Sequence, residues 1–172
     1  MNCEKGLVRR LDELGRVVIP KELRQSLRIE NGNMLEFFYK DGTELIVKKY
    51  EPIREISSLG EKLLYSLRGF LDVGFLLCDM QKVVAVQNHS KKDTMGKKLF
   101  SSFVEKLKFT HTPFDCEKPI DAVLKENNKI FPIVSQGIVS GCVIVTSKNQ
   151  CENCVSISVS TIVQILSDYL SE

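Results

Sequence analysis

Residues 6–24 read GLVRRLDELGRVVIPKELR, and this stretch decides the fold of the N-terminal part of the chain. Alternating apolar and charged residues predict a strand over Leu7–Leu11, and β-branched residues predict a second strand over Arg16–Ile19. Asp12–Gly15 lies between the two strands and supplies a turn. Two short strands joined by a turn indicate a β-hairpin.

A short helix and a second pair of strands follow this hairpin. Lys21–Leu27 carries apolar residues at helical spacing, and the asparagines and glycine at 31–33 are expected to end that helix. Met34–Tyr39 and Glu44–Lys49 read as strands. The Asp41-Gly42 pair between them can adopt the positive φ angles of a tight hairpin turn. The predicted order of this segment is β-β-α-β-β.

The size of this segment limits its stability. A segment of about 50 residues buries too little apolar surface to be secure alone, so we expect dimerisation to complete its core. Beyond Pro52 the pattern changes to longer apolar-periodic segments that alternate with strand-like runs. The predicted domains are therefore residues 1–52 and 53–172.

Basic residues gather at one end of the first domain, although the whole chain carries a net charge of only +2. Between Lys5 and Arg28, three acidic residues accompany Lys5, Arg9, Arg10, Arg16, Lys21, Arg24 and Arg28. The planar fork of arginine serves phosphate oxygens and base edges alike. The cluster indicates a nucleic-acid surface, and the alternative is an ordinary solvated strand edge.

The stretch 6–24, together with LIVKKY at residues 45–50, resembles the AbrB family of transition-state and sporulation transcription factors. The resemblance implies a swapped-hairpin fold, in which two chains interleave their strands into one homodimer that binds double-stranded DNA. It also implies a regulator that activates and represses sporulation-stage genes. Three arginines are implied to contact DNA, and two further cations are expected to add phosphate charge: Arg9, Arg16 and Arg24, then Arg10 and Lys5.

Two features of this segment leave other interpretations open. Gln25 stands where some members of the AbrB family carry a second arginine after Arg24, which indicates a different operator preference. Similar swapped-hairpin dimers also occur in antitoxins that bind a toxin partner. Such antitoxins usually carry a disordered acidic tail, whereas this chain continues into a second globular domain, and that favours the regulator.

The second domain reads as strands flanked by helices. Apolar residues at helical spacing predict helices near residues 56–71, 99–107 and 155–170. Strands are predicted over residues 74–79, 82–86, 130–135 and 140–146, with Gln136-Gly137 joining the last two. The order α-β-β-α-β-β-α resembles a GAF domain, a small-ligand sensor fold. The whole chain is therefore expected to be α+β, with an α/β GAF-like second domain.

Two apolar stripes, Ile56–Leu71 and Val155–Leu170, lie at the ends of this second domain. The resemblance implies that such outer helices join two dimers into a homotetramer by coiled-coil-like packing. The alternative is that each stripe only covers its own sheet, because one apolar face is what any core-facing helix shows.

A GAF-like pocket is expected between the sheet and the connecting segment 88–119. That segment carries His89, Lys91, Lys92, Thr94, His111 and Thr112. Such side chains suit an anionic or polar small-molecule effector. The alternative is a filled pocket that serves assembly only.

The sequence gives no sign of a catalytic site or a cofactor. No nucleotide-binding glycine motif occurs, and neither of the two histidines, His89 and His111, belongs to a metal-ligand pair. Some GAF-fold proteins are methionine sulfoxide reductases with a cysteine nucleophile, and this is the enzymatic alternative. Cys78 and Cys142 lie in apolar strands, where a buried thiol is usually inert, so we expect them to serve packing.

The six cysteines are expected to be thiols, because the N-terminus lacks a signal peptide and the reducing cytosol disfavours disulfides. No run of about 18 apolar residues occurs, so the sequence predicts a cytoplasmic protein with no membrane partner. Cys151 and Cys154 form a Cys-x-x-Cys pair, which is incomplete as a zinc site because four ligands are needed. A redox-sensitive pair and a pair without function are the other interpretations, and no metal site is assigned.

Overall fold

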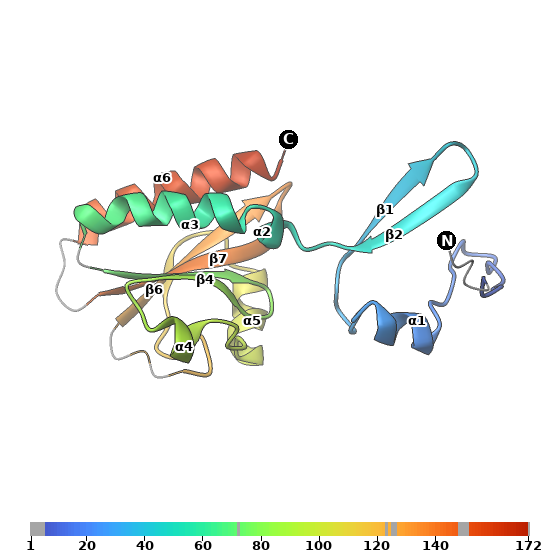
Figure 1. The fold of residues 1–172 in the computed structure, drawn as a ribbon, viewed down its shortest axis with the longest axis horizontal. Coiled ribbons are helices and arrows are strands. Elements are labelled where there is room, and N and C mark those ends of the chain that lie inside the picture. The colour runs from blue at the N-terminus through green and yellow to red at the C-terminus, as the bar shows by residue number, and fades with distance from the viewer. Residues whose placement is uncertain (1–5, 72, 123, 125–126, 148–151, 172) are drawn as a thin grey trace. The chain divides into compact units, whose positions relative to one another are not determined.

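The computed structural model describes residues 6–71, 73–122, 124, 127–147 and 152–171. The chain forms two compact units, which Figure 1 shows as ribbons. The first unit ends at Tyr50, and the second unit begins at Glu51. Each unit is described by itself below.

The first unit contains helix α1 (Lys21–Ser26) and the antiparallel strands β1 (Leu35–Lys40) and β2 (Glu44–Lys49). Asp41 and Gly42 adopt φ angles of 50° and 73°, and the Thr43 N–H donates to the Lys40 carbonyl at 3.2 Å. Positive φ at both central residues is what a type I′ turn requires. The tight hairpin turn predicted from the Asp-Gly pair is therefore confirmed.

The first predicted hairpin is only partly formed, which corrects the expected β-β-α-β-β order. The turn is present, because the Asp12 N–H donates to the Arg16 carbonyl at 3.0 Å and Gly15 adopts a φ of 74°. Residues 7–11 and 16–19 flank it without forming strands, and β1 pairs only with β2 within the described part of this unit. A strand needs a neighbour along its length for its N–H and C=O groups. Among the described residues, the single chain supplies no such neighbour for residues 7–11 and 16–19.

Helix α1 ends earlier than predicted. Arg28 adopts a left-handed φ of 53°, its N–H donates to the Gln25 carbonyl at 3.1 Å, and the Ile29 N–H donates to the Arg24 carbonyl at 2.8 Å. This pair of bonds is a Schellman motif, which satisfies the last helical carbonyls. The helix therefore stops before the asparagines and glycine at 31–33, which were expected to end it.

The first unit has no apolar core of its own. Pro20 is the single buried residue among residues 6–50, and no aliphatic or aromatic side chain there is buried. Val8 is 87% exposed and Tyr39 is 78% exposed. The other large exposed apolar residues of this unit are Leu7, Leu11, Leu14, Val17, Val18, Leu23, Leu27, Met34, Phe37, Phe38 and Leu45. So much exposed apolar surface marks an interaction surface.

The second unit is built on a five-stranded antiparallel sheet of order β4-β3-β7-β6-β5. The strands are β3 (Gly74–Asp79), β4 (Val83–Gln87), β5 (Phe114–Asp115), β6 (Asn127–Ser135) and β7 (Ile138–Ser147). The helices are α2 (Pro52–Glu55), α3 (Ser57–Ser66), η1 (Leu67–Gly69), α4 (Lys91–Thr94), α5 (Ser101–Lys108) and α6 (Glu152–Tyr169). The predicted α-β-β-α-β-β-α order is confirmed, with short additional elements. This mixed architecture is compatible with the GAF-like expectation.

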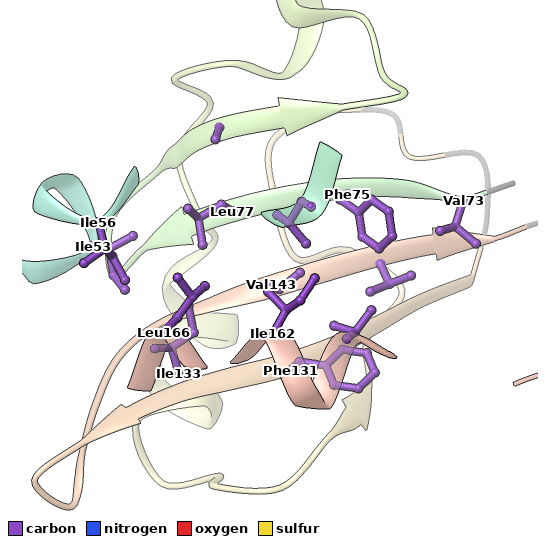
Figure 2. Packing of buried hydrophobic residues seen from close by; sticks show 14 of the residues in the cluster. Ile53, Ile56, Val73, Phe75, Leu77, Phe131, Ile133, Val143, Ile162 and Leu166 are labelled. Carbon is purple, nitrogen blue, oxygen red and sulfur yellow. The ribbon is translucent and has the colours of Figure 1, made fainter. Parts of the chain in front are cut away.

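Two apolar cores cover the two faces of this sheet. Neighbouring residues of β3 point to opposite faces, so Leu77 joins one core while Leu76 joins the other. Figure 2 shows the first core, in which Leu77, Phe131 and Leu166 lie between the sheet and helices α3 and α6. Helix α5 covers the other face. Because both faces are covered, β3 is buried over nearly its whole length.

The apolar stripes of the terminal helices pack mainly on the sheet of their own chain. Val159 and Leu166 are 0% exposed, and Leu64 is 1% exposed. In contrast, Phe70, which was expected in the first stripe, is 86% exposed. The outer surface of these helices instead carries exposed Tyr65, Ile157, Ile165 and Tyr169. Most of each predicted stripe is therefore core.

Candidate nucleic-acid interface

The predicted DNA-contacting residues come from two elements of the first unit. Arg9, Arg10 and Arg16 are exposed on the irregular segment before α1, whereas Arg24 is half-buried on α1 itself. Lys5, the fifth predicted residue, lies outside the described residues. The four described arginines are thus available as cations.

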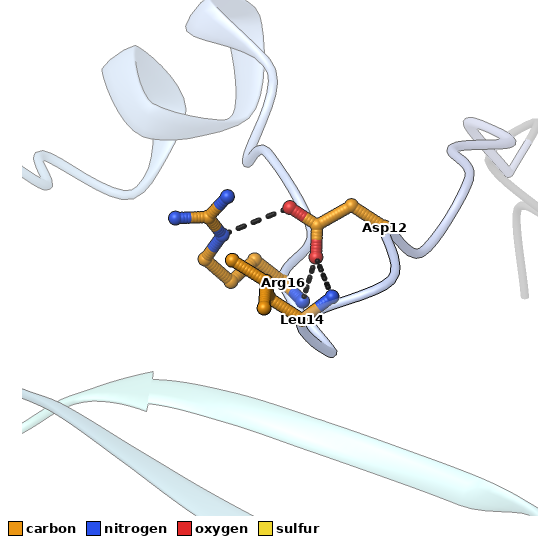
Figure 3. Close-up of polar contacts among 3 residues, drawn as sticks. All are labelled: Asp12, Leu14 and Arg16. Carbon is orange, nitrogen blue, oxygen red and sulfur yellow. Dashed lines mark hydrogen bonds and ion pairs between the residues drawn. The ribbon is translucent and has the colours of Figure 1, made fainter.

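Asp12 and Arg16 form the best-defined polar site in this unit (Figure 3). The Asp12 Oδ1 accepts hydrogen bonds from the Leu14 N–H at 3.0 Å and the Arg16 N–H at 2.7 Å. Its Oδ2 accepts from the Arg16 Nε at 2.8 Å, which is also an ion pair. One carboxylate therefore closes the turn and holds the guanidinium at the same time.

The electrostatics of this site follow from these contacts. The backbone hydrogen bond from Arg16 and then the side-chain hydrogen bond from Arg16 lower the pKa of Asp12. Asp12 therefore stays ionised throughout the neutral range. The sequence identified Asp12 only as a turn residue. The Asx-turn spacing, with donors two and four residues later, was the available signal for its second contact.

Arg24 and Arg9 lie in different surroundings. The Arg24 Nε is buried, and no hydrogen-bond partner for it exists among the described residues. A buried, unsatisfied donor of a charged group normally finds a partner in the functional assembly. The Arg9 Nη1 donates to the neighbouring Val8 carbonyl at 3.1 Å, a local contact that leaves the side chain exposed.

Three described cysteines of the second unit, Cys78, Cys116 and Cys142, lie in buried or half-buried surroundings. Cys78 and Cys142 face each other across β3 and β7, and both are 0% exposed. Burial raises the pKa of the Cys78 thiol, and burial also raises that of half-buried Cys116. A buried thiol with a raised pKa is a poor nucleophile at neutral pH. Cys154 is exposed on α6, whereas Cys3 and Cys151 lie outside the described residues.

Two residues of the expected effector segment 88–119 form polar contacts with other elements of the second unit. The His89 Nε2 lies 2.6 Å from the Thr146 Oγ1, and the Lys91 Nζ lies 2.9 Å from the Glu61 Oε1. The sheet face under this segment is filled by an apolar cluster that includes Phe103.

A cavity of about 330 Å³ lies elsewhere, between β6, α6 and the residues near Pro113. His111 is the one residue of the predicted effector set that lines it. The other five residues of that set do not line this cavity.

Neither a metal cluster nor a membrane span is found in the part of the chain that the structure describes. There, no three His, Cys, Asp or Glu side chains come together in an arrangement that could hold an ion. None of the helices formed by the described residues is both long enough and apolar enough to cross a membrane.

Comparison with known families defines the class of this protein. The family model described as Stage V sporulation protein T C-terminal, transcription factor, matches residues 55–171. The model described as Antidote-toxin recognition MazE, bacterial antitoxin, matches residues 8–55. Together the two matches define a two-part protein, with a first part that matches the MazE model and a second part characteristic of one group of transcription factors.

Known proteins of Bacillus subtilis (strain 168) narrow this class. Stage V sporulation protein T is 34% identical over 151 residues, which cover 84% of this chain and 85% of that protein. Transition state regulatory protein AbrB is 50% identical over 56 residues, covering 33% of this chain and 57% of AbrB. Putative transition state regulator Abh is 53% identical over 47 residues, covering 27% of this chain and 50% of Abh. The chain belongs to the stage V sporulation protein T family, and its resemblance to AbrB is confirmed.

Proposed function

We propose that this protein is a sequence-directed DNA-binding regulator of sporulation-stage transcription, and that the arginines of the first unit contact the DNA. The observation that carries this proposal is the exposed basic segment around the Asp12–Arg16 site, in a chain of the stage V sporulation protein T family. Exposed arginines suit both phosphate oxygens and guanine edges. Arg9, Arg16 and Arg24 supply the principal contacts, and Arg10 and Lys5 add phosphate charge.

The active form of the first unit is a homodimer with interleaved strands. Residues 7–11 and 16–19 have strand-forming sequences and exposed apolar side chains, and a second copy of the same hairpin would supply the missing ladder. Isologous pairing of this kind also covers both copies of the apolar surface at once. A fragment of residues 1–52 is therefore expected to be dimeric, and light scattering measures this directly.

The second unit joins two such dimers into a homotetramer through the outer surfaces of α3 and α6. Exposed Ile157 and Ile165 lie eight residues apart, which is about 80° around the axis of α6, so both belong to its outward face. An exposed apolar face with helical spacing suits helix-on-helix packing. The role of the second unit is to assemble the homotetramer and to bind an effector, and not to catalyse a reaction. A small-molecule effector would bind in the cavity lined by His111. The protein acts in the cytoplasm.

An antitoxin is the second candidate function, and the match of residues 8–55 to the MazE model favours it. The two functions differ in the partner that the first unit binds. A regulator binds duplex DNA with or without a toxin, whereas an antitoxin forms a stable complex with a toxin protein. Co-expression with the neighbouring genes of the native host, followed by affinity purification, separates the two.

Fluorescence anisotropy with labelled duplex DNA tests the proposed function. The duplex is selected from a random library by the wild-type protein, and the test variant carries alanine at Arg9, Arg16 and Arg24. Affinity is expected to fall at least about a hundredfold, because each cation supports both charge and specific contact. The control replaces Lys62, Lys92 and Lys108, three exposed cations of the second unit, by alanine. Unchanged affinity of the arginine variant contradicts the proposal.

A further inference from the structure

We propose that Asp12 is a positioning residue for DNA recognition, which holds Arg16 so that its two terminal nitrogens face outward as a fork for a guanine edge. This inference rests on the proposed function, and it assigns to Asp12 a role beyond closing the turn. The guanine edge offers two adjacent acceptors, O6 and N7, and arginine is the residue that most often reads them.

The first step of the argument is that Asp12 itself is fixed. Its Oδ1 accepts from two backbone N–H groups of the turn, those of Leu14 and Arg16. The Asp12 backbone N–H also donates to the Arg16 carbonyl. Rotation of the carboxylate would break these bonds, so Oδ2 is held in one place before any ligand arrives.

The second step is that the Asp12 Oδ2 accepts a hydrogen bond from one particular nitrogen of Arg16. It accepts from Nε at 2.8 Å, and Figure 3 draws no contact between Asp12 and the two terminal nitrogens. The Arg16 side chain remains 72% exposed despite this contact. The end of the guanidinium, Nη1 and Nη2, is therefore presented in an orientation that suits two parallel hydrogen bonds.

The third step is that a carboxylate at this position opposes nonspecific DNA binding. A negative charge inside a basic cluster repels the phosphate backbone. Orientation of a long side chain, in contrast, removes rotamer freedom in advance and so favours a contact with defined geometry. Charge and positioning therefore predict opposite signs for the removal of the Asp12 charge.

Asp12→Asn separates these effects in the full-length protein. The amide oxygen can still accept from the Leu14 and Arg16 N–H groups, and asparagine suits such turns. The amide nitrogen then faces the Arg16 Nε and cannot hold it. Glu13→Gln is the matched control, because it removes the same charge one residue away from an exposed side chain. Both variants are measured on a selected duplex and on a scrambled duplex of equal composition.

Asp12→Asn is expected to weaken binding to the selected duplex about tenfold, and to change binding to the scrambled duplex less than about threefold. Glu13→Gln is expected to leave both affinities equal or stronger. In an Arg16→Ala background, Asp12→Asn is expected to cause no further loss, since the residue that it positions is gone. This double-mutant cycle also separates positioning from any effect of the substitution on folding.

Three results would overturn the inference. The first is stronger binding by Asp12→Asn, as for Glu13→Gln, which would make Asp12 only a repulsive charge. The second is an equal loss on both duplexes, which would assign Arg16 to a phosphate. The third is a full loss that persists in the Arg16→Ala background, which would make Asp12 only a turn residue. Full affinity of Arg16→Ala alone would instead contradict the proposed role of Arg16, so the two failures are distinguishable.

Discussion

The two units of this protein differ in where their apolar side chains go. In the second unit, both faces of the sheet are covered by helices of the same chain, and Phe75, Leu77 and Leu166 are fully buried. In the first unit, comparable side chains such as Val18 and Phe37 stay exposed. The second unit therefore completes its apolar core within a single chain, whereas the first unit leaves its apolar side chains exposed, and in the function proposed above a second copy covers them.

The largest expected effect is loss of a core residue in the second unit. Leu77→Ala removes a side chain that is packed against α3 and α6, and we expect the free energy of unfolding to fall by about 3 kcal/mol. Because this core is formed within one chain, the loss should not depend on protein concentration. Chemical denaturation at two concentrations measures this. Phe109→Ala, at a position just after α5 that is 88% exposed, is the control and should cost less than about 0.5 kcal/mol.

Val18→Asp tests whether the stability of the first unit, in contrast to that of the second unit, depends on a second copy of the chain. Val18 is 77% exposed in the single chain, so a polar residue there would cost almost nothing if the chain stayed alone. In an interleaved dimer the same change buries a carboxylate against apolar side chains, and we expect a cost of about 2 kcal/mol per chain. Sedimentation should show dissociation that is reversed at high concentration. Dimers of wild-type strength would contradict the swapped-hairpin proposal.

A matched pair on α6 sharpens the comparison within the second unit. Ile162 is 5% exposed and belongs to the core, whereas Ile165 is 44% exposed on the outer surface. Ile162→Asp is expected to unfold the second unit. Ile165→Asp is expected to leave its melting temperature within about 2 °C of wild type but to convert tetramers into dimers. Light scattering that still detects tetramers of Ile165→Asp would show that this surface is not the contact.

The smallest expected effect is the titration of Asp12. Its contacts with Arg16 lower its folded-state pKa, so its contribution to stability is complete above the ordinary pKa of an aspartate. That contribution is lost only as the pH falls through the depressed folded-state pKa. Between pH 5 and 8 we therefore expect no change in the Asp12–Arg16 pair, and carboxyl-carbon NMR should place the midpoint of Asp12 below that of an aspartate in a short unstructured peptide. A midpoint equal to that of the peptide aspartate would contradict this assignment.

Local chemistry explains the parts of the fold that were predicted correctly. The Asp41-Gly42 turn forms because two residues with positive φ are needed and these residues tolerate it. Strands β6 and β7 form where apolar residues alternate with other residues, and helix α6 forms where apolar residues recur at helical spacing. The basic cluster with Arg9, Arg16 and Arg24 was also predicted from the sequence, because the charge of a residue follows from its type alone.

Other features depended on contacts between residues that the sequence pattern does not relate. The position of the cavity beside α6 follows from how β6 and α6 pack, which no local motif specifies. The early end of α1 follows from the left-handed conformation of Arg28, a residue type that rarely adopts it. The bond from Arg16 to the Asp12 Oδ2 required the turn geometry to be known.

The sequence by itself determined the element order of the second unit, the hairpin turns, the basic residues of the first unit and the family, because these depend on residue type and spacing along the chain. The tertiary structure alone decided which apolar residues become core. Val159 is buried and Val18 is exposed, although both are valines in apolar stretches. Burial depends on what packs against a side chain: the second unit supplies a sheet for Val159, and the single chain supplies nothing among its described residues to cover Val18.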